Sequence, residues 1–197
     1  MPSDPNPSRN VPSRRDFLAQ GSALSVGAAL GSLALARAAH AGVDETIKVA
    51  LVGCGNRGTG AAVQALSTKG PVELWAMADT FADRLQGSLK SLAATAEIQP
   101  RLKVPGERQF VGLDAYRKAI DSGVDLVLIA APPGFRPAQF EYAVNAGKHV
   151  FMEKPVATDG PGVRRLLAAN QEAKQKGLKV GVGLQRHHDP IYVDLVK

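Results

Sequence analysis

The chain has 197 residues, of which 45% are hydrophobic and 21% are charged, which is typical of a soluble globular protein. The length suits one domain, or one and a fraction, and the composition excludes disorder of the whole chain, although we expect the first ten residues to be unstructured. The net charge of +6 is scattered without a Lys/Arg-rich run, so we expect no nucleic acid among the partners.

The first 41 residues have the pattern of an export signal. Arg14 and Arg15 stand before an uncharged stretch, residues 17–36, that is rich in Ala, Gly, Ser and Leu. The small-residue pattern Ala39-His40-Ala41 follows as a candidate cleavage site. The whole segment resembles a bacterial twin-arginine signal. We therefore expect the twin-arginine translocase as a partner and a periplasmic or other extracytoplasmic location for the mature protein.

An uncleaved signal that anchors the protein in a membrane is the alternative, since about 20 residues suffice to span a bilayer. The glycines and serines of this stretch, together with Gln20, make it a poor bilayer-spanning helix. Cleavage with a mature chain that begins near Gly42 is therefore favoured. Cys54 is the only cysteine, so the exported protein forms no intramolecular disulfide.

From residue 46 onward, short apolar runs alternate with helical patterns. We expect strands at residues 47–52, 72–78, 109–111, 125–130, 149–152 and 179–183. We expect helices at residues 57–67, 81–96, 114–121, 137–145 and 163–175, and an irregular loop at residues 98–107. Strands separated by helices predict βαβ units, and six strands match the doubly wound Rossmann α/β fold with strand order 3-2-1-4-5-6. The domain is expected at residues 42–185.

A dinucleotide fingerprint lies between the first strand and the first helix. It reads Gly53-Cys54-Gly55-Asn56-Arg57-Gly58. The first glycine allows a tight turn, the second lets the backbone approach a diphosphate, and the third lets helix and strand pack closely. The free N–H groups at the helix start predict diphosphate binding, with Asn56 and Arg57 as further candidate contacts. We interpret Cys54 as a small filler residue rather than a nucleophile.

Asp79 ends the second strand, 21 residues after Gly58. A carboxylate at this point accepts hydrogen bonds from the adenosine ribose hydroxyls and repels a 2′-phosphate. The sequence therefore favours NAD over NADP as the cofactor. Arg84, in the following helix, is the feature that keeps NADP as the alternative.

A second motif is far more specific than the glycine loop. It reads Ala146-Gly147-Lys148-His149-Val150-Phe151-Met152-Glu153-Lys154-Pro155. Together with the fingerprint, Pro132-Pro133 and Gly183-Leu184-Gln185-Arg186, it resembles the glucose–fructose oxidoreductase / inositol dehydrogenase (Gfo/Idh/MocA) family. The resemblance covers residues 46–197, and exported members with twin-arginine signals are familiar in this family.

The resemblance implies roles at the matching positions. Glu153 would hold the nicotinamide ribose, and Lys154 would be the catalytic residue that faces nicotinamide and substrate. An ammonium group there can stabilise alkoxide character on a substrate hydroxyl, and we expect partial burial to lower its pKa. Ala131, Pro132 and Pro133 would line the nicotinamide side of the cleft. Arg186 would contact cofactor or substrate, whereas the adjacent histidines are not expected to bind a metal.

Family members continue into a domain that carries most substrate contacts. This sequence ends at Lys197, so we expect residues 186–197 to begin a linker to a substrate domain that is missing. The favoured interpretation is the cofactor-binding part of a periplasmic NAD(P)-dependent oxidoreductase that acts on a sugar, cyclitol or related polyol. The alternative is an exported nucleotide-binding module without turnover.

Overall fold

The computed structural model describes residues 45–195. The export signal expected at residues 1–41, its cleavage pattern and the alternative membrane anchor lie outside the described residues. Within residues 45–195, no helix combines the length and the apolar character that crossing a membrane requires.

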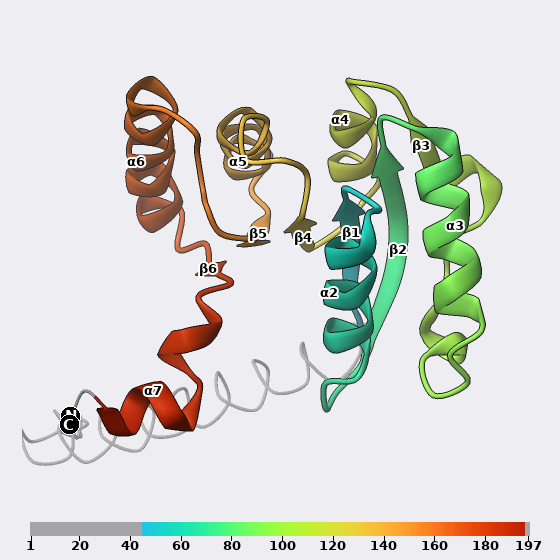
Figure 1. Cartoon of the computed structure of the whole chain (residues 1–197). Coiled ribbons are helices and arrows are strands. Elements are labelled where there is room, and N and C mark those ends of the chain that lie inside the picture. Colours follow the sequence, from blue (N-terminus) through green and yellow to red (C-terminus); the bar gives the residue numbers. More distant parts are fainter. Residues whose placement is uncertain (1–44, 196–197) are drawn as a thin grey trace, which may run out of the picture. The chain divides into compact units, whose positions relative to one another are not determined.

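Strands and helices alternate along the described chain, as the hydrophobic pattern predicts (Figure 1). The strands are β1 (Ile47–Val52), β2 (Val72–Asp79), β3 (Gln109–Val111), β4 (Leu126–Ile129), β5 (His149–Met152) and β6 (Val180–Val182). The α-helices are α2 (Asn56–Leu66), α3 (Ala82–Ala93), α4 (Ala115–Ile120), α5 (Arg136–Asn145), α6 (Gly160–Gln175) and α7 (Pro190–Leu195). Short 3-10 helices are η1 (Gln99–Arg101), η2 (Gly106–Arg108) and η3 (Gln185–His187).

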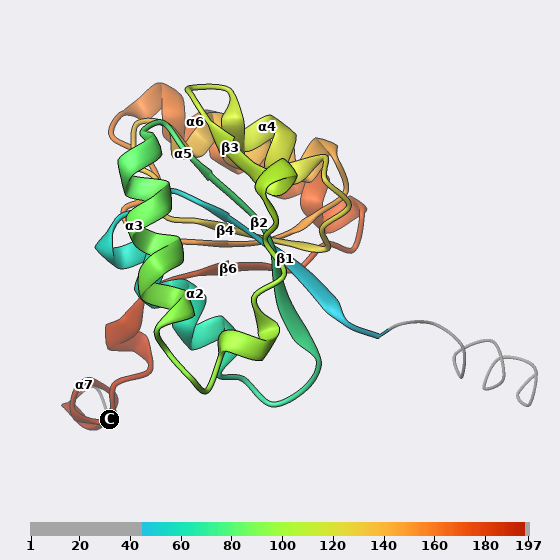
Figure 2. The same cartoon turned by 90° about the vertical axis from the view of Figure 1, so that its right-hand side faces the viewer.

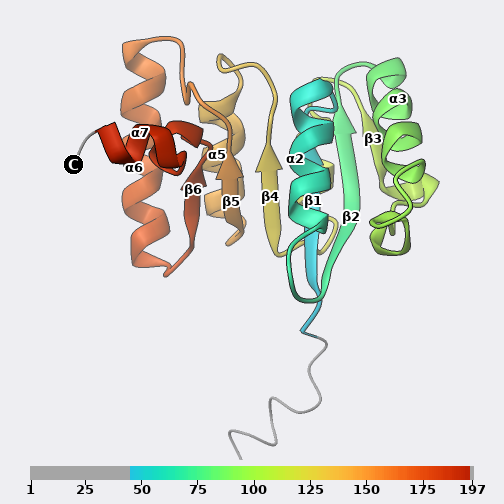
Figure 3. The same cartoon turned by 60° about the horizontal axis from the view of Figure 1, so that its bottom comes forward.

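The six strands form one parallel sheet in the order β3-β2-β1-β4-β5-β6. Figure 3 shows them side by side in this order. The order reverses between β1 and β4, because the chain crosses from one half of the sheet to the other after β3. This arrangement confirms the expected Rossmann fold, and it places a ligand-binding crevice at the carboxyl ends of β1 and β4.

Helices cover both faces of the sheet, with α2 and α3 on one side and α4, α5 and α6 on the other (Figure 2). Neighbouring residues of a strand point to opposite faces. Val49 and Leu51 of β1 accordingly pack in the cluster with α2 and α3, whereas Ala50 and Val52 pack in the cluster with α4, α5 and α6. Each fully buried Leu or Val side chain contributes about 1.5–3 kcal/mol through the apolar area removed from water.

Helix ends differ most from expectation where capping decides them. Helix α6 begins at Gly160, before the expected start at residue 163, because the Asp159 side chain accepts a 2.7 Å hydrogen bond from the Gly162 N–H and so caps the helix. Helix α3 ends at Ala93, before the expected residue 96. The segment expected as an irregular loop contains η1 and η2, and Leu102 between them forms a parallel bridge with Leu74 of β2.

Candidate cofactor site

The residues singled out in the sequence lie at one edge of the sheet. Parallel strands all end at the same edge, so the glycine loop after β1, Asp79 at the end of β2, Ala131 after β4 and Glu153 after β5 become neighbours. A cavity of about 550 Å³ opens at this edge. Its lining includes the predicted residues Gly53, Gly55, Asp79, Ala131 and Pro132.

The first and third fingerprint glycines are required by the packing of the loop itself. Gly53 has φ +95°, and a Cβ there would lie 2.5 Å from the Ala131 backbone nitrogen. A Cβ at Gly58 would overlap the Gly53 carbonyl oxygen. Helix α2 therefore approaches the β1 turn so closely that only glycine fits at residue 58.

The second fingerprint glycine meets no such contact. No atom lies within 4 Å of the position that a Cβ at Gly55 would occupy. Gly55 is also the N-cap of α2, makes no side-chain capping hydrogen bond, and precedes a first turn without acidic residues. Open space in front of uncapped N–H groups at the positive end of a helix dipole fits a diphosphate. The residues present therefore fit the dinucleotide that the sequence predicts.

Asp79 ties the glycine loop to the start of α3. Its Oδ2 accepts a 2.6 Å hydrogen bond from the Cys54 N–H, and its Oδ1 accepts a 2.9 Å hydrogen bond from the Phe81 N–H. Each carboxylate oxygen has a second lone pair, so both can still accept hydrogen bonds from a ribose. Arg84 is exposed and lines the same cavity as Asp79.

Cys54 is buried beneath the phosphate loop, with 3% of its surface exposed. Burial first, and the charge of Asp79 second, raise the pKa of the Cys54 thiol to about 12. The thiol donates a weak hydrogen bond to the Ala78 carbonyl at 3.5 Å. Because the thiolate is the reactive form, this geometry agrees with the interpretation of Cys54 as a filler residue.

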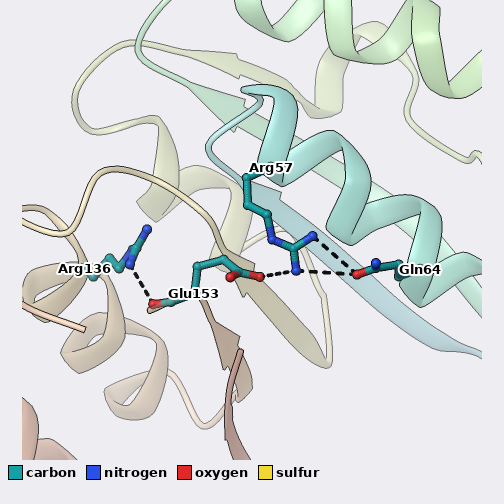
Figure 4. Close-up of polar contacts among 4 residues, drawn as sticks. All are labelled: Arg57, Gln64, Arg136 and Glu153. Atoms are coloured by element: carbon teal, nitrogen blue, oxygen red, sulfur yellow. Dashed lines mark hydrogen bonds and ion pairs between the residues drawn. The ribbon is translucent and has the colours of Figure 1, made fainter. Parts of the chain in front are cut away.

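Glu153 is a buried carboxylate, 6% exposed, at the end of β5. Its Oε1 lies 2.5 Å from Nη2 of Arg57 in the phosphate loop (Figure 4). Its backbone N–H donates to the Ile129 carbonyl of β4 at 3.0 Å. The structure thus brings together Arg57 and Glu153, which the sequence predicts separately as cofactor contacts.

Gly183 also belongs to this site, although its place in the family motif suggested no role for it. A Cβ at Gly183 would lie 2.8 Å from Glu153 Oε2. The backbone that follows β6 therefore packs directly against the carboxylate. The only signal in the sequence is the glycine itself, placed at the end of a short strand.

Arg136, at the start of α5, is a charged member of the site that the sequence did not predict. The residue is buried, with 6% of its surface exposed. It donates to the carbonyls of Ala131 and Glu153, each at 2.7 Å, and to the carbonyl of Pro155. Burial lowers the pKa of Arg136 and the charge of Glu153 opposes that shift, and the group remains a cation.

Lys154 lies between two residues whose carbonyls Arg136 holds. Its side chain is exposed, and within residues 45–195 its ammonium makes no hydrogen bond or ion pair. The expected partial burial is therefore not found, because none of the described elements covers this rim of the sheet. The Lys154–Pro155 peptide bond is cis.

Several predicted contacts do not line the main cavity. They are Arg57, Gly58, Glu153 and Lys154, together with three further residues. Asn56 lines a second, polar hollow of about 550 Å³ between α2 and α3, and Pro133 does not line the main cavity. Arg186 is exposed in η3, with its guanidinium carbon 5.0 Å from the centre of the Tyr192 ring. Within residues 45–195, no group of three or more His, Cys, Asp or Glu side chains is placed to hold a metal ion.

Hydrophobic residues that the sequence analysis passed over surround the cavity. Phe81, Leu113 and Phe135 are more than half exposed and line it from three different connections. Each follows a different strand, so no local periodicity could reveal that they share one wall. Their apolar surface suits the flat face of a base.

The family model of the Gfo/Idh/MocA oxidoreductases, described as an oxidoreductase family with an NAD-binding Rossmann fold, matches residues 47–184. The chain belongs to this family. The match spans the whole sheet and both motifs, so the family assignment rests on the same residues that build the site.

Several relatives and solved structures of family members are similar to this chain. Inositol 2-dehydrogenase from Salmonella typhimurium is 29% identical over 151 residues, which are 76% of this chain and 40% of that protein. Inositol 2-dehydrogenase from Paracoccus denitrificans is 38% identical over 104 residues, 53% of this chain and 30% of that protein. The chain therefore spans less than half the length of these relatives.

Among solved structures, scyllo-inositol dehydrogenase from Lactobacillus casei with bound NAD(H) and scyllo-inositol is 27% identical, with a TM-score of 0.58. The similarity covers 77% of this chain and 40% of that one. A 3-ketoreductase from Actinomadura kijaniata in complex with NADP is 25% identical, with a TM-score of 0.56 over 77% of this chain and 42% of that one. Relatives with either nicotinamide cofactor thus share this fold.

Proposed function

We propose that this chain is the cofactor-binding part of an NAD-dependent oxidoreductase that transfers hydride between nicotinamide and a sugar, cyclitol or related polyol. The observation that carries the proposal is the ion pair between Arg57 and Glu153. It links the phosphate loop to the residue that immediately precedes Lys154, so the two motifs serve one elongated site. The inositol dehydrogenases among the relatives support the substrate class.

In this proposal each part of the site holds one part of the cofactor. The N–H groups at the start of α2 bind the diphosphate, with Gly55 leaving the space that it needs. Asp79 accepts hydrogen bonds from the adenosine ribose, and Glu153 accepts them from the nicotinamide ribose. Ala131 and Pro132, which line the same cavity as Asp79, contact the middle of the molecule.

The bound cofactor supplies nicotinamide C4 as the acceptor or donor of hydride. The Lys154 ammonium, which has no partner among residues 45–195, donates a hydrogen bond to the reacting oxygen of the substrate. It thereby stabilises the negative charge that develops on that oxygen. In the reducing direction the ammonium gives its proton to that oxygen, and the resulting neutral amine accepts the proton again when the substrate hydroxyl is oxidised.

Preference for NAD over NADP forms part of the proposal. The negative charge of Asp79 disfavours a 2′-phosphate on the same ribose. Arg84 lines the cavity nearby and is the group that attracts such a phosphate. The balance between these two side chains sets the preference, and the charge next to the ribose hydroxyls decides it in favour of NAD.

Export through the twin-arginine translocase to the periplasm, with cleavage near Gly42, is a further part of the proposal. It is supported by the order of Arg14-Arg15, the uncharged stretch at residues 17–36 and Ala39-His40-Ala41. This route carries folded proteins, so a cofactor site assembled in the cytoplasm crosses intact.

The test is a titration of the purified chain with NADH, followed through nicotinamide fluorescence, and then an assay with a panel of sugars and cyclitols. We expect saturable binding of NADH by this chain, and oxidation of at least one cyclitol or sugar by NAD+ when the chain is joined to the remaining part of the enzyme. Binding without turnover would leave a nucleotide-binding module as the function of the chain. Absence of binding to both NADH and NADPH would contradict the proposal.

A further inference from the structure

Arg136 is the buried cation of the site, and its three acceptors come from two separate connections. Nε donates to the Ala131 carbonyl directly after β4, and Nη1 donates to the carbonyls of Glu153 and Pro155 after β5. Figure 4 shows the guanidinium directed at the Glu153 backbone, on the opposite side of that residue from Arg57. One side chain thus joins the ends of two neighbouring strands.

The two acceptors after β5 lie on either side of Lys154. The Lys154 side chain has no bond of its own within the described residues, so the position of its Cα depends on the backbone to either side. The Glu153 N–H bond to Ile129 fixes one point of this backbone at 3.0 Å. Arg136 fixes the carbonyls of Glu153 and Pro155, and no other side chain of residues 45–195 makes a hydrogen bond to them.

The guanidinium group of Arg136 is well suited to holding three carbonyls. A guanidinium presents five N–H donors in a rigid plane, so it can serve several carbonyls in fixed directions at once. An ammonium is a point charge on a flexible stem and lacks that fork. Three carbonyl oxygens that converge in a buried place also need a positive charge, because their partial negative charges repel one another.

We propose that Arg136 is a positioning residue, which sets where the Glu153 carboxylate and the Lys154 ammonium stand relative to the nicotinamide half of the cofactor. It acts through the backbone and does not touch the cofactor itself. The inference rests on the proposed function. It predicts that a change at Arg136 impairs recognition of the nicotinamide half while the diphosphate and adenosine half is still bound by the glycine loop and Asp79.

The experiment compares the affinity for NADH with the affinity for ADP, which lacks the nicotinamide and its ribose. In Arg136→Ala we expect at least about tenfold weaker NADH binding, the effect of losing a hydrogen bond to a charged group, with ADP affinity within about twofold of the wild type. Added guanidinium ion should restore part of the NADH affinity of this variant. Arg136→Lys should lie between the wild type and Arg136→Ala.

Arg101 provides the matched control. It also donates from one guanidinium nitrogen to two backbone carbonyls, Leu66 at 2.9 Å and Thr68 at 3.0 Å, but it lies at the end of α2 away from the cavity. Arg101→Ala should lower the melting temperature and leave the ratio of NADH to ADP affinity unchanged. This comparison separates loss of an arginine–carbonyl bond from loss of positioning.

Two results would overturn the positioning role. The first is an unchanged ratio of NADH to ADP affinity in Arg136→Ala, whether or not both affinities fall. The second is a wild-type ratio in Arg136→Lys, which also decides the matter if the alanine variant fails to fold. Failure of the proposed function looks different, because the wild-type chain itself would then bind NADH no more tightly than ADP.

Discussion

Arg57 Nη2 and Glu153 Oε1 lie 2.5 Å apart, and this ion pair joins the phosphate loop to the motif after β5. The two side chains differ in environment, since 49% of the Arg57 side chain is exposed but only 7% of that of Glu153. Because the Glu153 carboxylate is buried, it would be left without a counter-charge if Arg57 moved away, and an unpaired buried charge is destabilising. Hydroxyl groups of a bound cofactor that donate to Glu153 would take over part of this stabilisation.

The position of Arg57 in the phosphate loop predicts the effect of replacing it. In Arg57→Gln we expect NADH to bind about three- to tenfold more weakly, because a positive charge next to the diphosphate is lost. The loss should diminish at high salt, which screens exposed charges. Fluorescence titrations at two ionic strengths measure both effects.

Arg165 is the matched control for that variant. It pairs with Glu141 on the far side of α5, and both of those side chains are well exposed. Arg165→Gln removes the same charge from the protein without touching the phosphate loop. Equal weakening of NADH binding in the two variants would show that Arg57 acts only through the net charge.

Removal of the Asp79 charge should change the choice of cofactor. In Asp79→Asn we expect weaker NADH binding and a rise of about tenfold in the ratio of NADPH to NADH affinity. The amide keeps a hydrogen-bond acceptor for the Cys54 or Phe81 N–H, whereas Asp79→Ala leaves both donors without their partner. Alanine should therefore also cost about 1–3 kcal/mol of stability. An unchanged ratio in the asparagine variant would refute the role of the charge.

Substitution of Lys154 should abolish turnover without weakening the binding of NADH. We expect Lys154→Ala to bind NADH within about twofold of the wild type and to lose turnover of any sugar or cyclitol that the wild type oxidises. Lys174→Ala removes another exposed lysine, from the last turn of α6, and should leave turnover intact. Loss of NADH affinity in Lys154→Ala as large as that in Asp79→Ala would contradict the assigned role.

The buried thiol of Cys54 predicts a dependence on alkaline pH. Its pKa is about 12 in the folded protein against 9.0 for an ordinary thiol, so the folded state holds the proton more tightly. Stability is then complete below pH 9 and declines above it, by about 1.4 kcal/mol per pH unit, until the folded thiol also ionises. Urea unfolding of the wild type and of Cys54→Ala between pH 8 and 11 measures this, because the other titrating groups cancel in the difference. If the unfolding free energies of the two proteins changed with pH in the same way, the raised pKa of Cys54 would be refuted.

The export proposal has its own test in the intact precursor. Replacing both arginines, Arg14→Lys with Arg15→Lys, should leave the protein in the cytoplasm at its full length. The wild type should appear in the periplasm with a new N-terminus near Gly42. Cell fractionation and N-terminal sequencing report the two results, and export of the double variant at the wild-type level would contradict the proposal.

The strands of the sheet were predictable because each is marked by a pattern within its own few residues. Strands such as β1 and β5 are short apolar runs, and their ends in the structure match those expected from the sequence. The start of α6 was not predictable from apolar periodicity, because Asp159 and not a hydrophobic residue determines it. Pattern reasoning finds the interior of an element more readily than its boundary.

The residues of the candidate site likewise include some that the sequence predicts and others that it does not. The glycine loop and Asp79 were predictable because each has a fixed place relative to its own strand. Arg136 was not, since its acceptors follow two different strands and nothing in the adjacent sequence marks it as buried. The pairing of Arg57 with Glu153 was also beyond the sequence, because it depends on two connections that only the sheet order makes neighbours.

The contrast among the three fingerprint glycines has a consequence for related sequences. Residues 53 and 58 must be glycine for the turn to close and for α2 to pack, whereas at residue 55 a Cβ would meet no atom of the protein beyond its chain neighbours. A homologue that keeps the first and third glycines but carries a bulky residue at the second would retain this architecture and obstruct the place of the diphosphate. Within this fold, the residue at the position of Gly55 therefore distinguishes a homologue that can bind a dinucleotide from one that cannot.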